Sequence, residues 1–502
     1  MLILQNERRK VNACARNFIE LALKLEYNIS CMKMISGRED QHMTLQDYLN
    51  SLKYKTVAVI GIGVSNTPLL RLLLQNGIAV TACDKRLRSD LGDLADELEQ
   101  GGARLQLGAD YLDGLDQDVI FRTPGMRPDV PQLTAAREKG SVITSEMEVF
   151  FDVCPCSIIA VTGSDGKTTT TTMIAELLRA SGRTVHVGGN IGTPMLAQAG
   201  DMDPTDSVVL ELSSFQLMTM KKSPHIAVVT NLSPNHLDMH KGMEEYVASK
   251  ENIFLHQCSA DTAVFNLDND ITREQSTRAL GEVRMFSRRS SVENGVYLRG
   301  EEIVRCRNGV ETVVMTTDDI KLPGIHNVEN YMAAVAALDG MVDDETIRTF
   351  AREFGGVEHR IELVRTLNGV RYYNDSIASS PTRTIAGLRS FKEKVILIAG
   401  GYDKNIPFDE LGPEVVERVK LLVLCGATAD KIRTAVESAS GYVPGKPEIL
   451  TAHSLQEAAE LARSRAEEGD VVTLSPACAS FDQFPNFMAR GKAFKAIVNG
   501  WQ

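Results

Sequence analysis

The chain has 502 residues, 43% of them hydrophobic, and a formal net charge of −12. This length exceeds what one hydrophobic core usually supports, so we expect three domains. The negative charge argues against nucleic acid as a partner. Without a run of eighteen apolar residues or a secretory leader, no membrane insertion is expected. The nine scattered cysteines are typical of reduced thiols in a cytoplasmic protein.

Residues 1–42 differ from the rest of the chain. They carry several charges and no turn-bounded strand that would join the later pattern. Two interpretations remain open for them. They form a helical extension, or they precede the natural start of the protein, with Met43 as its first residue.

The first regular pattern is an apolar run at 57–60, followed by a glycine turn at Gly61 and Gly63, a leucine-rich helical stretch and a second strand that ends at Asp84. This order predicts the opening of a doubly wound parallel sheet. Asp84 stands about twenty residues after Gly61, where dinucleotide-binding folds place the acid that contacts ribose. Asn66 replaces the third glycine of that fingerprint. The turn is therefore predicted to hold a dinucleotide, another diphosphate-bearing nucleotide, or no ligand.

The most informative segment is an apolar strand, 158–162, that leads into a loop ending in Gly166, Lys167 and Thr168. A helical pattern follows, so the free backbone N–H groups of the loop are expected to face a phosphate. Lys167 would then contact the β- and γ-phosphates of a nucleotide, and the Thr168 hydroxyl would bind Mg²⁺. Val161 occupies the position of the first glycine in the full Walker pattern, so the loop is a shorter variant of it.

Further candidate metal ligands follow the next strands of this central segment. Glu211 ends an apolar run, and together with Thr168 it offers the hard oxygen ligands that Mg²⁺ prefers. His236 is a softer ligand. His236 and His240 have the spacing of a helical zinc pair, but the residues between them lack the glutamate that a zinc protease uses as its general base. A capping or core histidine is the alternative for His236.

The last third of the chain predicts a second Rossmann-like sheet. Buried strands are expected at 369–374, 395–399 and 471–474, and polar or glycine residues follow each of them. Ligands bind at this end of the strands in such sheets. We expect the loops after these strands to close over the central site.

In its motifs the chain resembles the Mur ligase family. The motifs follow one another in family order and cover roughly residues 56–495. They occupy residues 162–169, 188–192, 211–217, 231–238, 326–330, 359–362, 374–376 and 475–484. The last motif is typical of the family member that adds D-glutamate, and the signature of the diamino-acid-adding member is absent.

The resemblance implies an α/β fold of three domains. These are a Rossmann-like N-terminal sheet that holds a UDP-sugar, a central P-loop-type ATPase domain and a C-terminal Rossmann-like domain that brings the amino acid, with expected bounds of 43–153, 154–355 and 356–502. The implied reaction uses ATP and Mg²⁺. The carboxylate of UDP-N-acetylmuramoyl-L-alanine becomes an acyl phosphate, which the amine of D-glutamate attacks. We expect a cytoplasmic monomer in peptidoglycan precursor synthesis.

The resemblance also implies roles for individual residues, with Lys167, His236 and Lys250 as the catalytic ones. The implied ATP contacts are Gly163, Ser164, Asp165, Gly166, Lys167, Thr168, Thr169, Asn327, Asn330, Arg360 and Asp375. The implied metal ligands are Thr168, Glu211, His236 and Lys250, the last as a carbamate. The implied UDP-sugar contacts are Gly63, Val64, Ser65, Asp84, Lys85, Thr123, Pro124, Gly125 and Asn190. The implied D-glutamate contacts are Lys404, Ser480 and Phe487.

The chain departs from the family pattern at two places. Asp165 replaces the usual asparagine of the phosphate loop, which adds a negative charge near a phosphate. Ile377 and Ser379 replace the lysine and threonine that usually follow Asp375 and its neighbouring serine. A cation is therefore missing near the reacting groups, and either another lysine compensates or the amino-acid pocket is arranged differently. Three alternatives stay open: a ligase for another amino acid, a nicotinamide-dependent oxidoreductase and a non-catalytic nucleotide-binding scaffold.

Overall fold

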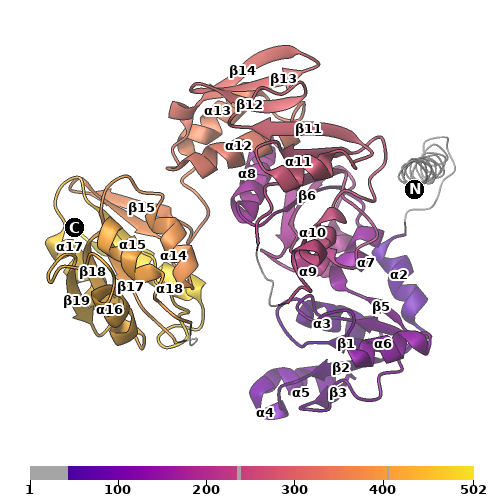
Figure 1. The fold of residues 1–502 in the computed structure, drawn as a ribbon. Coiled ribbons are helices and arrows are strands. Elements are labelled where there is room, and N and C mark those ends of the chain that lie inside the picture. The colour runs from indigo at the N-terminus through magenta and orange to yellow at the C-terminus, as the bar shows by residue number, and fades with distance from the viewer. Residues whose placement is uncertain (1–42, 235–238, 404–405) are drawn as a thin grey trace, which may run out of the picture. The chain divides into compact units, whose positions relative to one another are not determined.

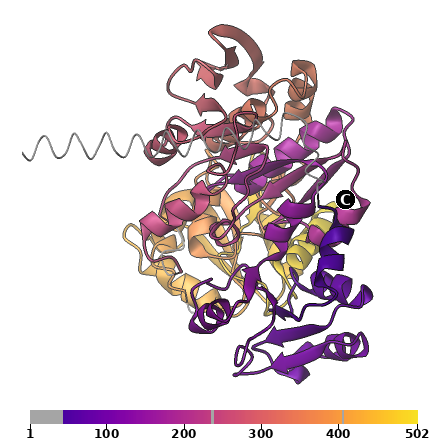
Figure 2. The same cartoon turned by 90° about the vertical axis from the view of Figure 1, so that its right-hand side faces the viewer.

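The computed structural model describes residues 43–234, 239–403 and 406–502. It is an α/β structure with three sheets, as the sequence predicts (Figure 1, Figure 2). The chain folds as two compact units. The first contains the described residues up to 317 together with 329–348, and the second contains 318–328 and 349–502. Since the first unit carries two of the sheets, the predicted bounds between three domains stay a prediction.

The first sheet is parallel throughout, in the order β3-β2-β1-β4-β5. Its strands are β1 (Val57–Ile60), β2 (Val80–Asp84), β3 (Arg104–Leu107), β4 (Val119–Phe121) and β5 (Val142–Thr144). The helices of this region are α2 (Leu45–Leu52), α3 (Thr67–Gln75), α4 (Arg88–Leu91), α5 (Asp93–Gln100), α6 (Pro131–Glu138) and α7 (Glu146–Val153). Strand order reverses between β1 and β4. The loops after these two strands therefore meet where open α/β sheets bind ligands.

The second sheet has the order β14-β13-β12-β11-β10-β9-β6-β8-β7. It is parallel from β7 to β12 and antiparallel from β12 to β14. Its strands are β6 (Ser157–Thr162), β7 (Val185–Gly189), β8 (Ser207–Glu211), β9 (Ile226–Val229), β10 (Thr262–Asn266), β11 (Glu282–Ser287), β12 (Gly295–Arg299), β13 (Glu302–Arg307) and β14 (Val310–Thr316). Both views place β12 to β14 at the opposite end of the first unit from the first sheet (Figure 1, Figure 2).

Six α-helices and two short 3-10 helices accompany this sheet in the described residues. They are α8 (Lys167–Ala180), α9 (Ser214–Leu217), α10 (Met243–Glu251), α11 (Asp270–Ser276), α12 (Ile325–Ala337), α13 (Asp344–Glu353), η1 (Leu196–Asp201) and η2 (Thr317–Asp319). β6 is the strand that leads into α8. It lies between β8 and β9, so the loops after these three strands meet at one edge of the sheet.

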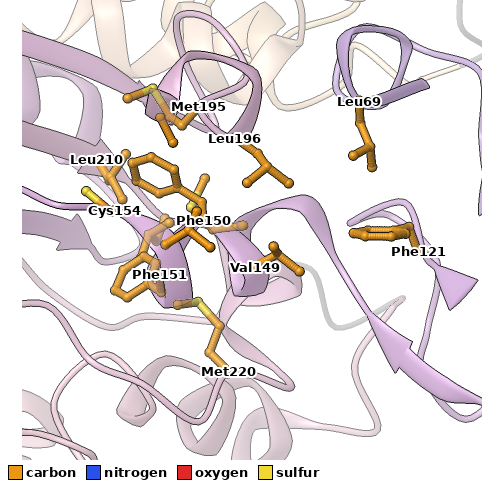
Figure 3. Close-up of a cluster of buried hydrophobic side chains, with 14 of the residues drawn as sticks. Leu69, Phe121, Val149, Phe150, Phe151, Cys154, Met195, Leu196, Leu210 and Met220 are labelled. Atoms are coloured by element: carbon orange, nitrogen blue, oxygen red, sulfur yellow. The ribbon is translucent and has the colours of Figure 1, made fainter. Parts of the chain in front are cut away.

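One continuous core joins the first two sheets, and α7 lies at its centre. Figure 3 shows side chains of α7 between Leu69 and Phe121 on the side of the first sheet and residues of the central region on the other. The labelled residues of α7 are Val149, Phe150 and Phe151, and those of the central region are Met195, Leu196, Leu210 and Met220. Each fully buried apolar side chain stabilises the fold by about 1.5 to 3 kcal/mol. This shared core therefore holds the two sheets together as one unit.

The second unit contains a sheet of order β15-β16-β20-β17-β18-β19, parallel except for the β15–β16 pair. Its strands are β15 (Glu362–Leu367), β16 (Val370–Asn374), β17 (Val395–Ala399), β18 (Val419–Cys425), β19 (Glu448–Ala452) and β20 (Val471–Leu474). Its helices are α14 (Pro381–Leu388), α15 (Leu411–Arg418), α16 (Ala429–Glu437), α17 (Leu455–Arg465) and α18 (Phe487–Gly500). Alternate residues of β17 enter different cores, one containing Val395 and Leu397 and the other Ile396 and Ile398. Helices thus cover both faces of the sheet, as a Rossmann-like domain requires.

Two expectations from composition concern the whole described chain. No helix in these residues is long and apolar enough to cross a membrane. The seven cysteines within the described ranges are all free, which is consistent with the reduced thiols predicted from their spacing.

Candidate active site

The predicted phosphate loop lies between β6 and α8. α8 begins at Lys167, and Gly166 precedes it with a φ of 77°, a conformation that L side chains rarely adopt. A Cβ at Gly166 would lie 2.4 Å from Asn330 Oδ1, and a Cβ at Gly163 would lie 1.9 Å from Thr230 Oγ1. Both positions therefore require glycine. No side chain caps the N-terminus of α8, so its first N–H groups are available to an anion.

Hydrogen bonds from other segments hold the loop in this shape. Ser164 N donates to Asn231 O at 2.8 Å, and Asp165 N donates to Asn231 Oδ1 at 3.0 Å. Ser164 Oγ donates to Ser233 O at 2.9 Å and lies 2.9 Å from the hydroxyl oxygen of Tyr246 on α10. The loop is thus fastened to the segment after β9 and to a helix that follows it.

Lys167 folds back over the loop. Its Nζ donates to the carbonyl oxygens of Gly163 at 3.0 Å and Ser164 at 2.9 Å. The ammonium group therefore lies beside the turn whose N–H groups favour an anion, which is where a charge-assisted phosphate contact needs it. This position supports the predicted phosphate contact, which stays a prediction.

Thr168, in the first turn of α8, lies beside Glu211, the last residue of β8. Thr168 Oγ1 donates to Glu211 Oε2 at 2.7 Å, and Glu211 is only 2% exposed. Its other carboxylate oxygen accepts a hydrogen bond from Asn190 Nδ2 at 2.7 Å, so Asn190, expected among the UDP-sugar contacts, lies beside the metal candidates. Hydroxyl and carboxylate oxygens suit Mg²⁺, which commonly takes its other ligands from substrate phosphates and water. Within the described ranges, no three His, Cys, Asp or Glu side chains gather as a self-sufficient metal site.

Lys250 lies on α10 against the phosphate loop and is 2% exposed. Its Nζ donates to Thr162 Oγ1 at 3.1 Å and to Gly163 O at 3.0 Å, and it lies 5.0 Å from the centroid of the Tyr246 ring. Burial, reinforced by the nearby charge of Lys167, lowers the pKa of Lys250 well below its usual value. The amine is thus poised to lose its proton, which carbamylation of a lysine requires.

Of the two histidines with the spacing of a zinc pair, His240 lies within the described residues. His236 lies outside the described residues, so its metal role stays a prediction. His240 is 4% exposed, its Nε2 lies 2.9 Å from Ser214 Oγ, and its ring stacks on Phe215 with centroids 5.1 Å apart. These contacts join α9 to the segment before α10, so His240 has a structural position.

The loops predicted to hold the UDP-sugar meet at the reversal of strand order between β1 and β4. A Cβ at Gly61, where φ is 90°, would lie 3.1 Å from Thr123 Cβ. A Cβ at Gly63 would meet no atom within 4 Å, so this part of the turn is open. The other exposed candidates are Val64, Ser65, Lys85 and Gly125. These residues are accessible to a ligand.

Asp84, expected as a UDP-sugar contact, has its carboxylate engaged by the turn itself. It is 6% exposed, and its Oδ2 accepts hydrogen bonds from Ile62 N at 2.7 Å and Arg86 Nη2 at 2.8 Å. Burial acts to raise the pKa of Asp84, but the hydrogen bonds from Arg86 and Ile62 outweigh it and lower the pKa to about 2. The charged carboxylate therefore shapes the turn.

Two arginines that were not among the predicted site residues connect the loop after β4, at 123–125, to the central region. Arg122 is 1% exposed, and its guanidinium donates to Thr219 Oγ1 at 2.7 Å and to Phe215 O at 3.2 Å. Arg127 makes a bidentate pair with Glu245 of α10, with both N···O distances 2.8 Å. Partners so far away in the chain leave no local sequence signal. The two arginines tie the loop at 123–125 to α9 and α10.

We expect Arg122→Met to lower the free energy of unfolding by about 1 to 3 kcal/mol, because buried oxygens lose a charged donor. The methionine keeps the apolar stem, so the loss reports the hydrogen bonds. The matched control is Arg71→Met, which removes an ion pair with Glu97 whose two side chains are each 48% exposed and should change stability by about 1 kcal/mol or less. Thermal denaturation of both variants checks this. Equal losses in the two variants would contradict the role given to Arg122.

In the second unit, the segment after β16 contains the predicted nucleotide contact Asp375. It is 4% exposed, and its Oδ2 accepts a hydrogen bond from Ser475 Oγ at 2.7 Å. Burial raises the pKa of Asp375 to about 7, although the Ser475 hydrogen bond and the charge of Arg360 act to lower it. Asn327 belongs to this unit, whereas Asn330 belongs to the first. Their common role at a nucleotide stays a prediction.

Of the residues predicted to receive D-glutamate, Lys404 lies outside the described residues. Ser480 is 2% exposed, and in the described part of the chain its Oγ has no hydrogen-bond partner. Phe487 begins α18, and its carbonyl oxygen accepts a hydrogen bond from Ser376 Oγ at 2.8 Å. A buried hydroxyl without a partner costs about 1 to 3 kcal/mol. The position of Ser480 therefore favours binding to a polar group from outside the chain.

Known proteins resemble this chain over most of its length. Residues 161–338 match the Mur ligase middle domain, and residues 359–478 match the glutamate ligase domain of Mur ligases. Over 459 residues, the chain is 54% identical to a UDP-N-acetylmuramoylalanine–D-glutamate ligase of Acetivibrio thermocellus, with 91% of this chain and 98% of the relative covered. The chain belongs to the Mur ligase family.

Two further proteins are similar to this Mur ligase. A UDP-N-acetylmuramoylalanine–D-glutamate ligase of Clostridium kluyveri is 52% identical over 454 residues, which cover 90% of this chain and 98% of the relative. The crystal structure of UDP-N-acetylmuramate-alanine ligase from Thermotoga maritima has a TM-score of 0.54 at 20% identity and covers 89% of this chain and 99% of that one. This last likeness shows the fold alone. The resemblance inferred from the motifs and the expected α/β fold are confirmed.

Proposed function

We propose that this Mur ligase uses ATP to join D-glutamate to UDP-N-acetylmuramoyl-L-alanine, in the cytoplasmic synthesis of peptidoglycan precursors. The observation that carries the proposal is the 54% identity to a relative of that name over 91% of this chain. In this reaction the carboxylate of the UDP-sugar attacks the γ-phosphate of ATP, and ADP leaves. The amine of D-glutamate then displaces phosphate from the acyl phosphate, and the amide remains.

The site residues suit this chemistry because two anions must approach each other. Positive charge and N–H donors aimed at the reacting phosphate reduce their repulsion and stabilise the transition state. Lys167 and the first N–H groups of α8 would supply them, with Gly163 and Gly166 allowing the close approach of the backbone. We assign the loop residues 163–169 to the phosphates of ATP.

Thr168 and Glu211 would hold Mg²⁺, with hydroxyl and carboxylate oxygens that the structure brings within 2.7 Å of each other. When bound, the ion neutralises phosphate charge and orients the reacting oxygens. We propose His236 and Lys250, as its carbamate, as further ligands. A carbamate would turn a buried cation into an anion with two oxygens, which suits a hard metal.

The remaining residues divide among three ligands. We assign Asn327, Asn330, Arg360 and Asp375 to the nucleotide. We assign Gly63, Val64, Ser65, Lys85, Asn190 and the loop at 123–125 to the UDP-sugar, with Asp84 holding the turn in shape. We assign Lys404, Ser480 and Phe487 to D-glutamate, and the domains to 43–153, 154–355 and 356–502.

Phosphate release from ATP tests this proposal directly. The enzyme is given ATP, Mg²⁺ and UDP-N-acetylmuramoyl-L-alanine together with D-glutamate, L-alanine, L-lysine or meso-diaminopimelate in separate reactions. Of the four amino acids, we expect only D-glutamate to give rapid phosphate release and a product heavier by one glutamate residue. A preference for another amino acid would refute the D-glutamate assignment, and phosphate release that ignores the UDP-sugar would refute the ligase reaction.

A further inference from the structure

The loop after β16 in the second unit lacks a cation at the position where one is expected. Asp375 and Ser376 are followed by Ile377, whose side chain is apolar. D-glutamate carries two carboxylates at neutral pH, and a carboxylate taken out of water needs a charged or polar partner. If the proposed function holds, a cation near this loop must come from another position in the chain.

Arg383, in the first turn of α14, lies against this loop. Its Nη1 donates to Ile377 O at 3.3 Å, which is its one side-chain hydrogen bond to the described residues. No ion pair joins it to a carboxylate in those residues, although its charge acts on the buried Asp375, whereas Arg371 and Arg389 pair with Glu393 and Glu414. Arg383 is also exposed. Most of its five N–H donors therefore remain available to a ligand.

A second arginine places this loop beside Ser480. Arg490 of α18 is 4% exposed, and its guanidinium donates to Ser376 O at 3.0 Å and to Ala479 O at 3.2 Å. Ile377 directly follows Ser376 in the chain, and Ser480 directly follows Ala479. Both residues therefore lie next to the guanidinium group of Arg490. The loop contacted by Arg383 and the buried hydroxyl of Ser480 therefore belong to one small region of the second unit.

Arg490 itself is not available to a substrate. Its N–H groups donate to the carbonyl oxygens of Ser376, Cys478 and Ala479 and to the hydroxyl of Ser376. Burial lowers the pKa of Arg490 to about 10. It joins the loops at 376–377 and 478–480, and Arg383 contacts the first of these loops at Ile377 O while other N–H donors of its guanidinium stay available.

We propose that Arg383 binds a carboxylate of the incoming D-glutamate and supplies the charge that Ile377 does not. Its planar guanidinium can hold a carboxylate with two parallel hydrogen bonds. The Ser480 hydroxyl, buried and without a partner in the described residues, would add a short, directional donor. Arg383 is then a specificity residue of the amino-acid site.

Steady-state kinetics of Arg383→Ala test the proposal. We expect the KM for D-glutamate to rise roughly ten- to a hundredfold, because the variant loses a charge-assisted contact to the carboxylate. The KM values for ATP and UDP-N-acetylmuramoyl-L-alanine should change little. Arg383→Lys keeps the charge without the fork and should fall between Arg383→Ala and the wild type. The double variant Ile377→Lys with Arg383→Ala restores a cation to the loop and should regain much of the lost affinity.

The matched control is Arg389→Ala, which removes a cation at the other end of α14 that already pairs with Glu414. Its KM for D-glutamate should stay within about twofold of the wild type. Arg383→Ala with an unchanged KM for D-glutamate, or a double variant no better than Arg383→Ala, would overturn the role of Arg383 and leave the ligase assignment standing. A wild-type enzyme that prefers another amino acid would instead refute the proposed function, and this inference with it.

Discussion

Lys167→Ala should lower ATP turnover by about a hundredfold or more. The reason is that the reacting phosphate loses a charged hydrogen-bond donor that stabilises the transition state. The ammonium group lies over the loop at 163–166, where its Nζ donates to Gly163 O and Ser164 O. Alanine removes this charge but keeps the helical conformation of α8. Phosphate release, measured with all three substrates at saturation, gives the effect on kcat.

The control for this variant is Arg179→Ala, at the far end of the same helix. Arg179 pairs with Glu176, and both side chains are more than 40% exposed, so its loss should leave turnover within about twofold of the wild type. A thermal melt of each variant separates lost catalysis from lost folding. If folded Lys167→Ala turns over ATP as fast as Arg179→Ala, the loop is not the phosphate site.

Lys250→Ala should be inactive, and small carboxylates such as formate or acetate should restore part of its activity. The lysine is buried against Thr162 and Gly163, and its lowered pKa favours the neutral amine. A neutral amine adds to CO₂ and releases a proton, which leaves a carbamate. A small carboxylate in the space left by alanine would replace the two oxygens of that carbamate. Ligase assays with increasing formate measure this rescue.

Lys241→Ala provides the matched control. Lys241 precedes the same helix, its side chain is 69% exposed, and it pairs with Asp129. This variant should remain active and should not respond to formate. Lys250→Met, which fills the space that alanine would leave, should be inactive without rescue. Normal activity of Lys250→Ala would show that the lysine has only a structural position, and inactivity without rescue would argue against a carbamate.

The phosphate loop could be predicted from the sequence because its determinants are local. An apolar strand, glycines at 163 and 166 and a helix that starts at Lys167 follow one another directly in the chain. Steric contacts with Thr230 and Asn330 add to the need for these glycines. The proximity of Thr168 and Glu211 was also foreseeable, since Thr168 follows β6, Glu211 ends β8, and the carboxyl ends of these parallel strands share one edge.

Partners distant in the chain could not be predicted in this way. The structure directs the Asn190 amide at Glu211, joins the Asp84 carboxylate to the backbone N–H of Ile62, and buries Arg122 against α9. Each of these contacts depends on how helices and loops pack on the sheets. The lowered pKa of Lys250 has the same origin, because burial causes it and the residues around the lysine in the sequence do not reveal that burial.

The sequence by itself determined the family, the α/β fold and the phosphate loop. These follow from the order of strands, glycines and helices along the chain, which is a local property. Only the tertiary structure decided which polar groups face one another. It connected the loop of Ser376 and Ile377 to the one containing Ser480 through Arg490. Such contacts arise from packing between segments that are distant in the chain. Bringing these segments together costs conformational entropy, and burial and hydrogen bonds that form together offset that cost.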